Sequence, residues 1–236
     1  MQWFKSFGSS LINLTKDALW QANCPLCKRP ADFILCKDCD RQITACQASA
    51  FLQSDHPISP KIPLYSWGIY DGALRRAIST CKYENHPEIM DAIAIKIADQ
   101  WQRSFHKQTF TQKSQKLTVI PIPLHDNKLK SRGFNQAEIL ARRFCALTDL
   151  TCYPQLLHRV KDTKPQMQTN NKQERAQNLA NAFTTSAPRH SRTTNLRSVI
   201  LFDDIYTTGT TIREAIATLT ASNFAVRGVI VLARTK

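Results

Sequence analysis

The stretch Leu201-Phe-Asp-Asp-Ile-Tyr-Thr-Thr-Gly-Thr210 indicates the fold more directly than any other part of the chain. An apolar run over residues 198–202 predicts a buried strand, and two carboxylates, Asp203 and Asp204, follow it. After a short turn, apolar residues recur over 212–219 at the spacing of an amphipathic helix. Thr211 and Glu214 have the spacing of a capping box, which predicts that this helix begins beside Thr211.

The turn between strand and helix is rich in hydroxyl groups and consists of Thr207, Thr208, Gly209, Thr210 and Thr211. A helix N-terminus offers backbone N–H groups and a positive dipole to an anion, and a glycine lets the backbone approach it closely. Carboxylates instead suit sugar hydroxyls, or the waters around a divalent cation. A ligand with a phosphate at one end and a diol at the other, such as ribose 5-phosphate, fits this pattern.

The order of strand, paired aspartates and Thr-Thr-Gly-x-Thr resembles the phosphoribosyl-pyrophosphate (PRPP) motif of the type I phosphoribosyltransferases. It does not fit a P-loop, because no Gly-Lys-Ser/Thr ends the turn. An ordinary loop before a capped helix is the alternative, and it leaves the paired carboxylates unexplained.

Strand and helix patterns alternate along the rest of the chain. We expect strands within 64–70, 117–122, 151–160, 182–185 and 225–232, and helices carrying apolar faces within 74–81, 89–101 and 137–147. Such alternation favours an α/β fold with a parallel sheet and helices on both faces. We divide the chain into an N-terminal segment, 1–60, and a phosphoribosyltransferase-like domain, 61–236, joined by a proline-rich linker.

Four of the eight cysteines form two Cys-x-x-Cys pairs: Cys24, Cys27, Cys36 and Cys39. Two such pairs can complete a tetrahedral thiolate shell, which selects zinc in a closed structural site. Disulfides and a redox dithiol are the alternatives. The resulting knuckle would serve as a docking surface, as a nucleic-acid clip or as a strut that packs on the next domain.

Positive charge is concentrated in the middle of the chain. The net charge is +14, and residues 101–200 hold 17 basic against 5 acidic residues. Such a field attracts polyanions, including a nucleic-acid backbone, although a soluble basic face without a polymeric ligand is the alternative. The candidate nucleic-acid residues are Lys128, Lys130, Arg132, Arg142, Arg143, Lys161, Lys164 and Arg175.

No apolar run approaches the length needed to cross a bilayer, and residues 1–20 lack the features of a signal peptide. Residues 1–20 fit an amphipathic helix that packs on the body of the protein or touches a membrane surface. We therefore expect a cytoplasmic protein, with a peripheral position at the inner face of the membrane as the alternative.

Three further features complete a family pattern: the cysteine pairs, Ile120-Pro-Ile-Pro-Leu-His125 and Arg132-Gly-Phe-Asn-Gln136. With the aspartate motif, they resemble the ComF/GntX family of competence-associated, phosphoribosyltransferase-like proteins. The family pattern also includes spaced residues that are found here as Arg159, Thr163, Gln166, Arg175, Asn178, Ala182 and Phe183.

The resemblance implies roles for several residues. Asp203 and Asp204 would face the ribose hydroxyls, and residues 207–211 would hold the 5-phosphate. The segment after the strand 117–122 would be a loop, and its residues His125, Lys128 and Arg132 would lie near the pyrophosphate of PRPP. Mg²⁺ would bridge pyrophosphate and ribose oxygens. Residues 161–175 would close over the ligand.

Three functions are compatible with this resemblance. The first is handling of single-stranded DNA in the cytosol during natural transformation or DNA utilisation, with a helicase-like competence protein as a partner. The second is transfer of ribose 5-phosphate from PRPP to an unknown acceptor. The third is a ligand sensor that uses the fold without chemistry.

Overall fold

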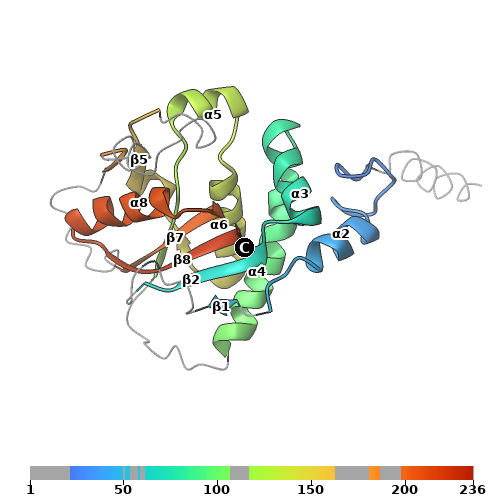
Figure 1. Cartoon of the computed structure of the whole chain (residues 1–236), viewed down its shortest axis with the longest axis horizontal. Helices are drawn as coiled ribbons and strands as arrows, with labels where there is room; N and C mark the ends of the chain where they lie inside the picture. Colours follow the sequence, from blue (N-terminus) through green and yellow to red (C-terminus); the bar gives the residue numbers. More distant parts are fainter. Residues whose placement is uncertain are drawn as a thin grey trace, which may run out of the picture.

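The computed structural model describes residues 22–49, 51–53, 58, 62–106, 117–162, 181–186 and 198–235 (Figure 1). The helices are α2 (Lys37–Thr44), α3 (Gly72–Tyr83), α4 (Glu88–His106), α5 (Asp126–Arg132), α6 (Gln136–Thr148), the 3₁₀ turn η1 (Pro154–Leu156) and α8 (Thr210–Ala221). The strands are β1 (Leu52–Gln53), β2 (Leu64–Ile69), β3 (Thr118–Pro121), β4 (Thr151–Cys152), β5 (Leu157–Arg159), β6 (Phe183–Thr185), β7 (Ser198–Tyr206) and β8 (Ala225–Arg234).

The main sheet has six strands in the order β1-β2-β8-β7-β3-β4. The five strands from β2 to β4 are parallel, and β1 pairs antiparallel with β2 at the edge. The predicted parallel sheet is therefore confirmed. Strands β5 and β6 form a separate two-stranded antiparallel sheet.

Side chains of the central strands alternate between two apolar cores, as the pleat of a strand requires. Ile200 and Phe202 of β7 belong to one core, while Val199 and Leu201 belong to the other. The chain folds this way because a parallel strand is apolar on both faces and must be covered on each. Helices on both faces of the sheet, as predicted, provide that cover.

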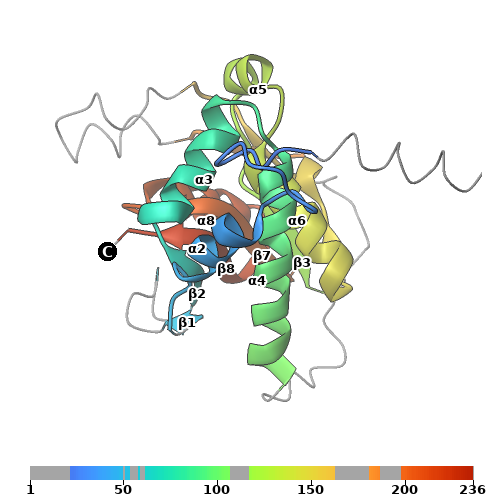
Figure 2. The same cartoon turned by 90° about the vertical axis from the view of Figure 1, so that its right-hand side faces the viewer.

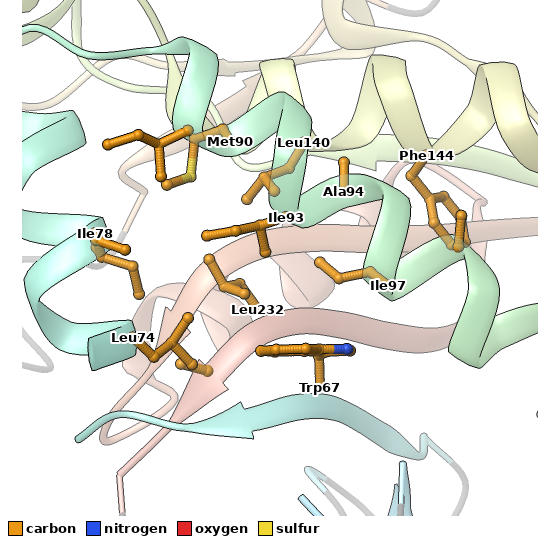
Figure 3. Close-up of a cluster of buried hydrophobic side chains, with 14 of the residues drawn as sticks. Trp67, Leu74, Ile78, Met90, Ile93, Ala94, Ile97, Leu140, Phe144 and Leu232 are labelled. Atoms are coloured by element: carbon orange, nitrogen blue, oxygen red, sulfur yellow. The ribbon is translucent and has the colours of Figure 1, made fainter. Parts of the chain in front are cut away.

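Helices α3, α4 and α6 cover the first face (Figure 2). Ile93 and Ile97 of α4 are fully buried and lie over Leu232 of β8 (Figure 3). Trp101 of α4 packs edge-on against Phe144 of α6, with 5.6 Å between ring centroids. These residues recur at the helical spacing seen in the sequence, so the predicted apolar faces are confirmed.

Helix α8 and the β5–β6 sheet cover the second face. Ile212, Ala215 and Leu219 of α8 are buried in this core. Leu157 of β5 and Phe183 of β6 belong to the same core. This face therefore brings the segment around residue 159 onto the sheet close to β7.

Two predicted elements differ from the structure. The segment after β3 was expected to be a loop, yet residues 126–132 form α5. Residues 151–160 were expected to form one strand, yet they divide into β4, η1 and β5. Pro154 at the start of η1 explains the division, because proline lacks the N–H that a continuing strand would need.

The segment that carries the cysteine pairs packs on the sheet domain. Backbone hydrogen bonds join Ile69 N to Cys46 O (3.0 Å) and Ala48 N to Trp67 O (2.8 Å). Lys96 of α4 donates to Asp40 of α2 at 2.9 Å. The domain boundary near residue 60 stays a prediction.

Among the described residues, no helix combines the length and the apolar character that crossing a membrane requires.

Several predicted features fall outside the described residues. They are residues 1–20, residues 163–175 of the segment 161–175 that was expected to close over the ligand, the candidate residues Lys164 and Arg175 within it, and Asn178.

Candidate functional site

The site lies where the topology of the sheet changes direction. From β3 the chain continues through α6 to β4 on one side, and from β7 it continues through α8 to β8 on the other. Neighbouring strands β3 and β7 thus send their helices to opposite faces of the sheet. A crevice outside the carboxyl ends of two such strands is where open α/β sheets bind ligands.

The aspartates sit at the carboxyl end of β7, inside the strand and not after it. Asp203 pairs in register with Val231 of β8, and the strand continues to Tyr206. The predicted strand was therefore too short. Alternation along the strand directs Asp204 to the face that carries Phe202 and helix α3.

Asp204 forms an ion pair with Lys82, the penultimate residue of α3. Both side chains are largely buried, at 7% and 15% exposure. The Oδ1 atom of Asp204 also accepts a hydrogen bond from Ile205 N at 2.9 Å. Although burial opposes ionisation, Lys82 lowers the pKa of Asp204 below its ordinary value, so Asp204 is the charged member of the pair.

Asp203 behaves in the opposite way. Burial, followed by the charge of Asp204, raises the pKa of Asp203 well above its ordinary value. Its Oδ1 atom accepts a hydrogen bond from Asp204 N at 2.8 Å. The two adjacent carboxyls therefore differ in protonation, as expected where like charges share one buried site.

Basic residues from three elements form a cluster in which Lys82 and Arg159 face the Asp203–Asp204 pair. They are Lys82 of α3, Lys128 and Arg132 of α5, and Arg159 of β5. Although Lys128 is exposed, partial desolvation and the charges of Arg132, Arg159 and Lys82 lower its pKa. Burial lowers the pKa of Arg159, whereas Asp203 and Asp162 oppose the shift. The two carboxylates thus stand beside a cluster of cations that an anionic ligand could neutralise.

The position of helix α5 is fixed by the conformation and contacts of the residues at its two ends. At its start, His125 Nδ1 accepts a hydrogen bond from Asn127 N at 3.3 Å. At its end, Gly133 adopts a left-handed conformation (φ 85°), which ends the helix without strain. A bridge between the backbones of His125 and Arg159 ties α5 to β5. His125 therefore has a structural role at the helix cap.

The Arg132-Gly-Phe-Asn-Gln136 motif joins α5 to α6. Asn135 caps α6 through Ala137 N (3.1 Å) and donates to Ile122 O (3.0 Å), which fixes the joint to the end of β3. Gln136 accepts a hydrogen bond from Arg132 Nη1 at 2.5 Å. The motif therefore holds the Arg132 guanidinium near the crevice.

The turn after β7 corrects the predicted capping box. Helix α8 begins at Thr210, its N-cap is Gly209 (φ 71°), and no side chain caps it. Glu214 instead accepts a hydrogen bond from Asn181 N at 2.6 Å. Because the helix starts without a side-chain cap, its first N–H groups are directed toward whatever occupies the turn.

Gly209 is required for two reasons. Its φ lies in the left-handed region, and an added Cβ would lie 2.6 Å from Cζ of Tyr206. The turn is closed by a hydrogen bond between Thr208 Oγ1 and Thr210 Oγ1 (2.9 Å) and by Arg213 Nη2 donating to Thr208 O (2.6 Å). Thr207 and Thr208 are exposed at the tip of the turn.

The four predicted zinc ligands do come together. Their ligand atoms all lie within 4.8 Å of one another, with Cys24 and Cys39 buried. Arg29 approaches Cys27 (3.5 Å) and lowers the pKa of that thiol to about 6, which favours a thiolate. A closed S₄ shell of this kind fits a structural zinc ion.

The candidate nucleic-acid residues do not form one group. Lys128 and Lys130 are exposed on α5 near the crevice, and Lys161 is exposed just beyond β5. Arg142 and Arg143 are exposed on α6, where Arg142 pairs with Glu138 at 2.7 Å.

Sequence reasoning missed Lys82 as a site residue, and it noted Arg159 only as part of the family pattern. Lys82 lies on a helix more than 100 positions before Asp204, and no spacing connects the two. The one available signal was a lysine near the end of an otherwise apolar helix face, and such lysines are usually solvated.

Comparison with known proteins gives two relatives. The chain is 24% identical over 195 residues to Competence protein ComFC of Bacillus subtilis, which covers 81% of this chain and 69% of that protein. It is 35% identical over 96 residues to Competence protein F of Haemophilus influenzae, which covers 41% of each. Together, these relatives support the resemblance of the chain to the ComF family. No family model matches the chain. Both relatives are competence proteins by name, and the chain spans 41% of the second one.

Proposed function

We propose that the chain is a ComF-type competence protein that binds PRPP, or a related ribose phosphate, in the crevice at the end of β7. We propose further that it handles single-stranded DNA in the cytosol during natural transformation or DNA utilisation. The observation that carries the proposal is a cluster of basic side chains beside the Asp203–Asp204 pair: Lys82, Lys128, Arg132 and Arg159.

Each part of the ligand has a matching part of the site. The turn 207–211 offers backbone N–H groups and hydroxyls to the 5-phosphate. Asp203 and Asp204 accept hydrogen bonds from the ribose hydroxyls. Lys128 and Arg132 face the pyrophosphate, and a guanidinium suits phosphate oxygens because it can bind two of them at once. Mg²⁺ bound with PRPP would supply charge neutralisation of the pyrophosphate.

The proposed path of the DNA begins at α5. Lys128 and Lys130 are exposed there, and Lys161 lies beyond β5 on the segment tied to α5 through Arg159. Phosphate contacts by such residues need no base recognition, so binding would be strong at low salt and weak at high salt. Residues 163–175 would add Lys164 and Arg175.

The cysteine cluster supports a structural zinc ion in this proposal. The metal would order a short segment that buries little apolar surface of its own. A helicase-like competence protein is the proposed partner. The proposed location is cytoplasmic, with a peripheral position at the inner face of the membrane as the alternative.

The alternative function is an active phosphoribosyltransferase. An acceptor nucleophile would attack C1 of the ribose, and the bond from C1 to the pyrophosphate oxygen would break. Pyrophosphate would leave with the bonding electrons, and the cations near Arg132 would stabilise its charge. The same cluster of cations favours this function, while the acceptor stays unidentified.

The experiment that tests the proposal measures single-stranded DNA binding across a salt series, with and without Mg²⁺-PRPP. The variants are Asp203→Ala/Asp204→Ala and Lys128→Ala/Lys130→Ala. Arg142→Ala/Arg143→Ala is the matched control, because it also removes two positive charges from an exposed helix. We expect the α5 variant to weaken binding and to flatten the salt dependence more than the α6 variant does.

Other outcomes have clear meanings. Salt-dependent DNA binding that PRPP and the aspartate variant leave unchanged would separate the DNA surface from the crevice. Absence of DNA binding, together with pyrophosphate release in the presence of an acceptor, would favour the transferase. Absence of both DNA and PRPP binding would overturn the proposal.

A further inference from the structure

The Asp203–Asp204 pair already has a cation within the protein. We infer that Lys82 is the resident counter-ion of this pair, so that the ribose-phosphate part of the ligand binds without a divalent cation. A divalent cation would then be needed only by the diphosphate part. The inference rests on the proposed function for its ligand and concerns how the same site is regulated by metal.

The geometry supports a fixed position for Lys82. The side chain comes from the last turn of α3, is 15% exposed and pairs with Oδ2 of Asp204. The adjacent Cys81 and Ile78 are fully buried, so the end of the helix is held in the core beside β7. Lys82 is therefore placed by packing and not by a chance approach of a surface side chain.

The oxygens that a metal would need are largely engaged. Oδ2 of Asp204 faces Lys82, and Oδ1 of Asp204 accepts from Ile205 N. Oδ1 of Asp203 accepts from Asp204 N. Direct coordination of Mg²⁺ requires octahedral oxygen geometry at short distances. A divalent cation on Asp204 would meet the positive charge of Lys82 at short range, and this repulsion weakens its binding.

The charges around the pair lead to the same conclusion. Asp204 is ionised beside Lys82, while Asp203 favours its protonated form. Arg132 and Arg159 add positive charge around the pair. A divalent cation therefore meets repulsion here, whereas ribose hydroxyls can still donate to the carboxyl oxygens. The charge of a diphosphate, by contrast, exceeds what these side chains supply, so that part of the ligand would carry its own metal.

The first experiment uses the metal alone. Mn²⁺ binding to the zinc-loaded full chain is measured by electron paramagnetic resonance for wild type, Lys82→Met, Lys82→Arg and Lys82→Met/Asp204→Asn. We expect Lys82→Met to bind Mn²⁺ at least about tenfold more tightly than wild type, because a like charge is removed from the site. Lys82→Arg keeps the charge and should match wild type. Lys82→Met/Asp204→Asn should not show the tighter Mn²⁺ binding expected of Lys82→Met.

The second experiment titrates ribose 5-phosphate into zinc-loaded wild type in buffer without Mg²⁺ and in buffer with Mg²⁺. We expect the two affinities to agree within about twofold, because no divalent cation takes part at the Asp203–Asp204 pair. In Lys82→Met, affinity without Mg²⁺ should fall about tenfold and Mg²⁺ should restore it. The wild-type comparison needs no variant, so it tests the inference even if Lys82→Met does not fold.

Two results would overturn the inference: Mn²⁺ binding to wild type as tight as to Lys82→Met, or ribose 5-phosphate binding to wild type that requires Mg²⁺. Failure of the proposed function is a different result. In that case wild type binds neither ribose 5-phosphate nor PRPP under any condition, and the Mn²⁺ measurements still decide whether Lys82 excludes a cation from the pair.

Discussion

Glu214 of α8 accepts a hydrogen bond from the backbone N–H of Asn181, with 2.6 Å between the two atoms. This contact links the start of α8 to the residues that lead into β6. Asn181 has a positive φ of 58°, so the chain turns sharply where the contact is made. The contact therefore anchors one side of the crevice to the helix that carries the threonine turn.

Replacing Glu214 should weaken the attachment of residues 181–186 to α8. We expect Glu214→Ala to lower the free energy of unfolding by about 1–2 kcal/mol, since a hydrogen bond to a charged acceptor is lost. Amide hydrogen exchange over residues 181–186 should increase. Glu214→Gln keeps an acceptor oxygen and should show a smaller effect. Equal exchange in wild type and Glu214→Ala would contradict the role of the contact.

The two aspartates should respond to substitution in opposite directions. Asp204→Asn leaves Lys82 buried without its partner, and we expect a loss of about 3 kcal/mol of stability at neutral pH. Asp203→Asn removes a carboxyl that resists ionisation in the folded state, and we expect a gain in stability at the same pH. Urea unfolding of both variants at pH 7 checks the two signs. Loss of stability in both would contradict the assignment of charge.

The pH dependence separates the two carboxyls further. Because the pKa of Asp203 is raised above 3.8, its stabilising contribution is present at lower pH and is lost as pH rises through the raised pKa. The advantage of Asp203→Asn over wild type should therefore shrink as pH falls toward 3.8. The pKa of Asp204 is lowered, so its contribution holds above 3.8 and is lost as pH falls through the lowered value. Thermal unfolding of wild type and both variants over an acid series measures these trends.

The close approach of Gly209 and Tyr206 predicts a non-additive pair of substitutions. Gly209→Ala should cost about 1–2 kcal/mol for the left-handed backbone and more for the clash with the Tyr206 ring. In a Tyr206→Ala background the clash is absent, so only the backbone cost should remain. A double-mutant cycle by urea unfolding measures the difference. Additive effects would show that the ring moves away without cost.

The cysteine cluster predicts the metal content of the chain. We expect about one zinc per chain by elemental analysis, and a loss of both zinc and thermal stability in Cys39→Ser. Cys46→Ser is the matched control, because Cys46 lies outside the cluster and donates to Gln42 O and Asp71 O. Loss of zinc in the control, or retention in Cys39→Ser, would contradict the ligand assignment.

The sheet and its helices could be predicted because their signals are local. Periodic apolar residues such as Ile89, Ile93 and Ile97 specify a buried helix face, and the pairs around Cys24 and Cys36 specify a metal cluster by spacing alone. Helix α5 was missed because its seven residues have no apolar period and none is buried; its caps, His125 and Gly133, stabilise it instead.

The prediction of a capping box at Thr211 was wrong for a related reason. Thr211 and Glu214 satisfied a local pattern, but the N-cap of α8 is Gly209, two residues before Thr211. Glu214 instead accepts a hydrogen bond from Asn181 N. Lys82 shows the same limit: its partner is set by how α3 packs on the sheet, which no short-range pattern records. The roles of the predicted site residues in ligand binding stay predictions.

Helix α3 is fastened at two places by polar contacts as well as by its apolar face. Arg76 donates to Cys39 Sγ (3.9 Å) and to Gln42 (3.4 Å) on the cysteine knuckle, which lies beside the helix in both views (Figures 1 and 2). Lys82 pairs with Asp204 further along. Six residues separate the two side chains, so they project roughly 120° apart around the axis and about 9 Å apart along it. Because these contacts lie on different sides of α3 and at different positions along its axis, rotation of the helix about its axis would break at least one of them. A shift of the helix along its axis by one residue would do the same.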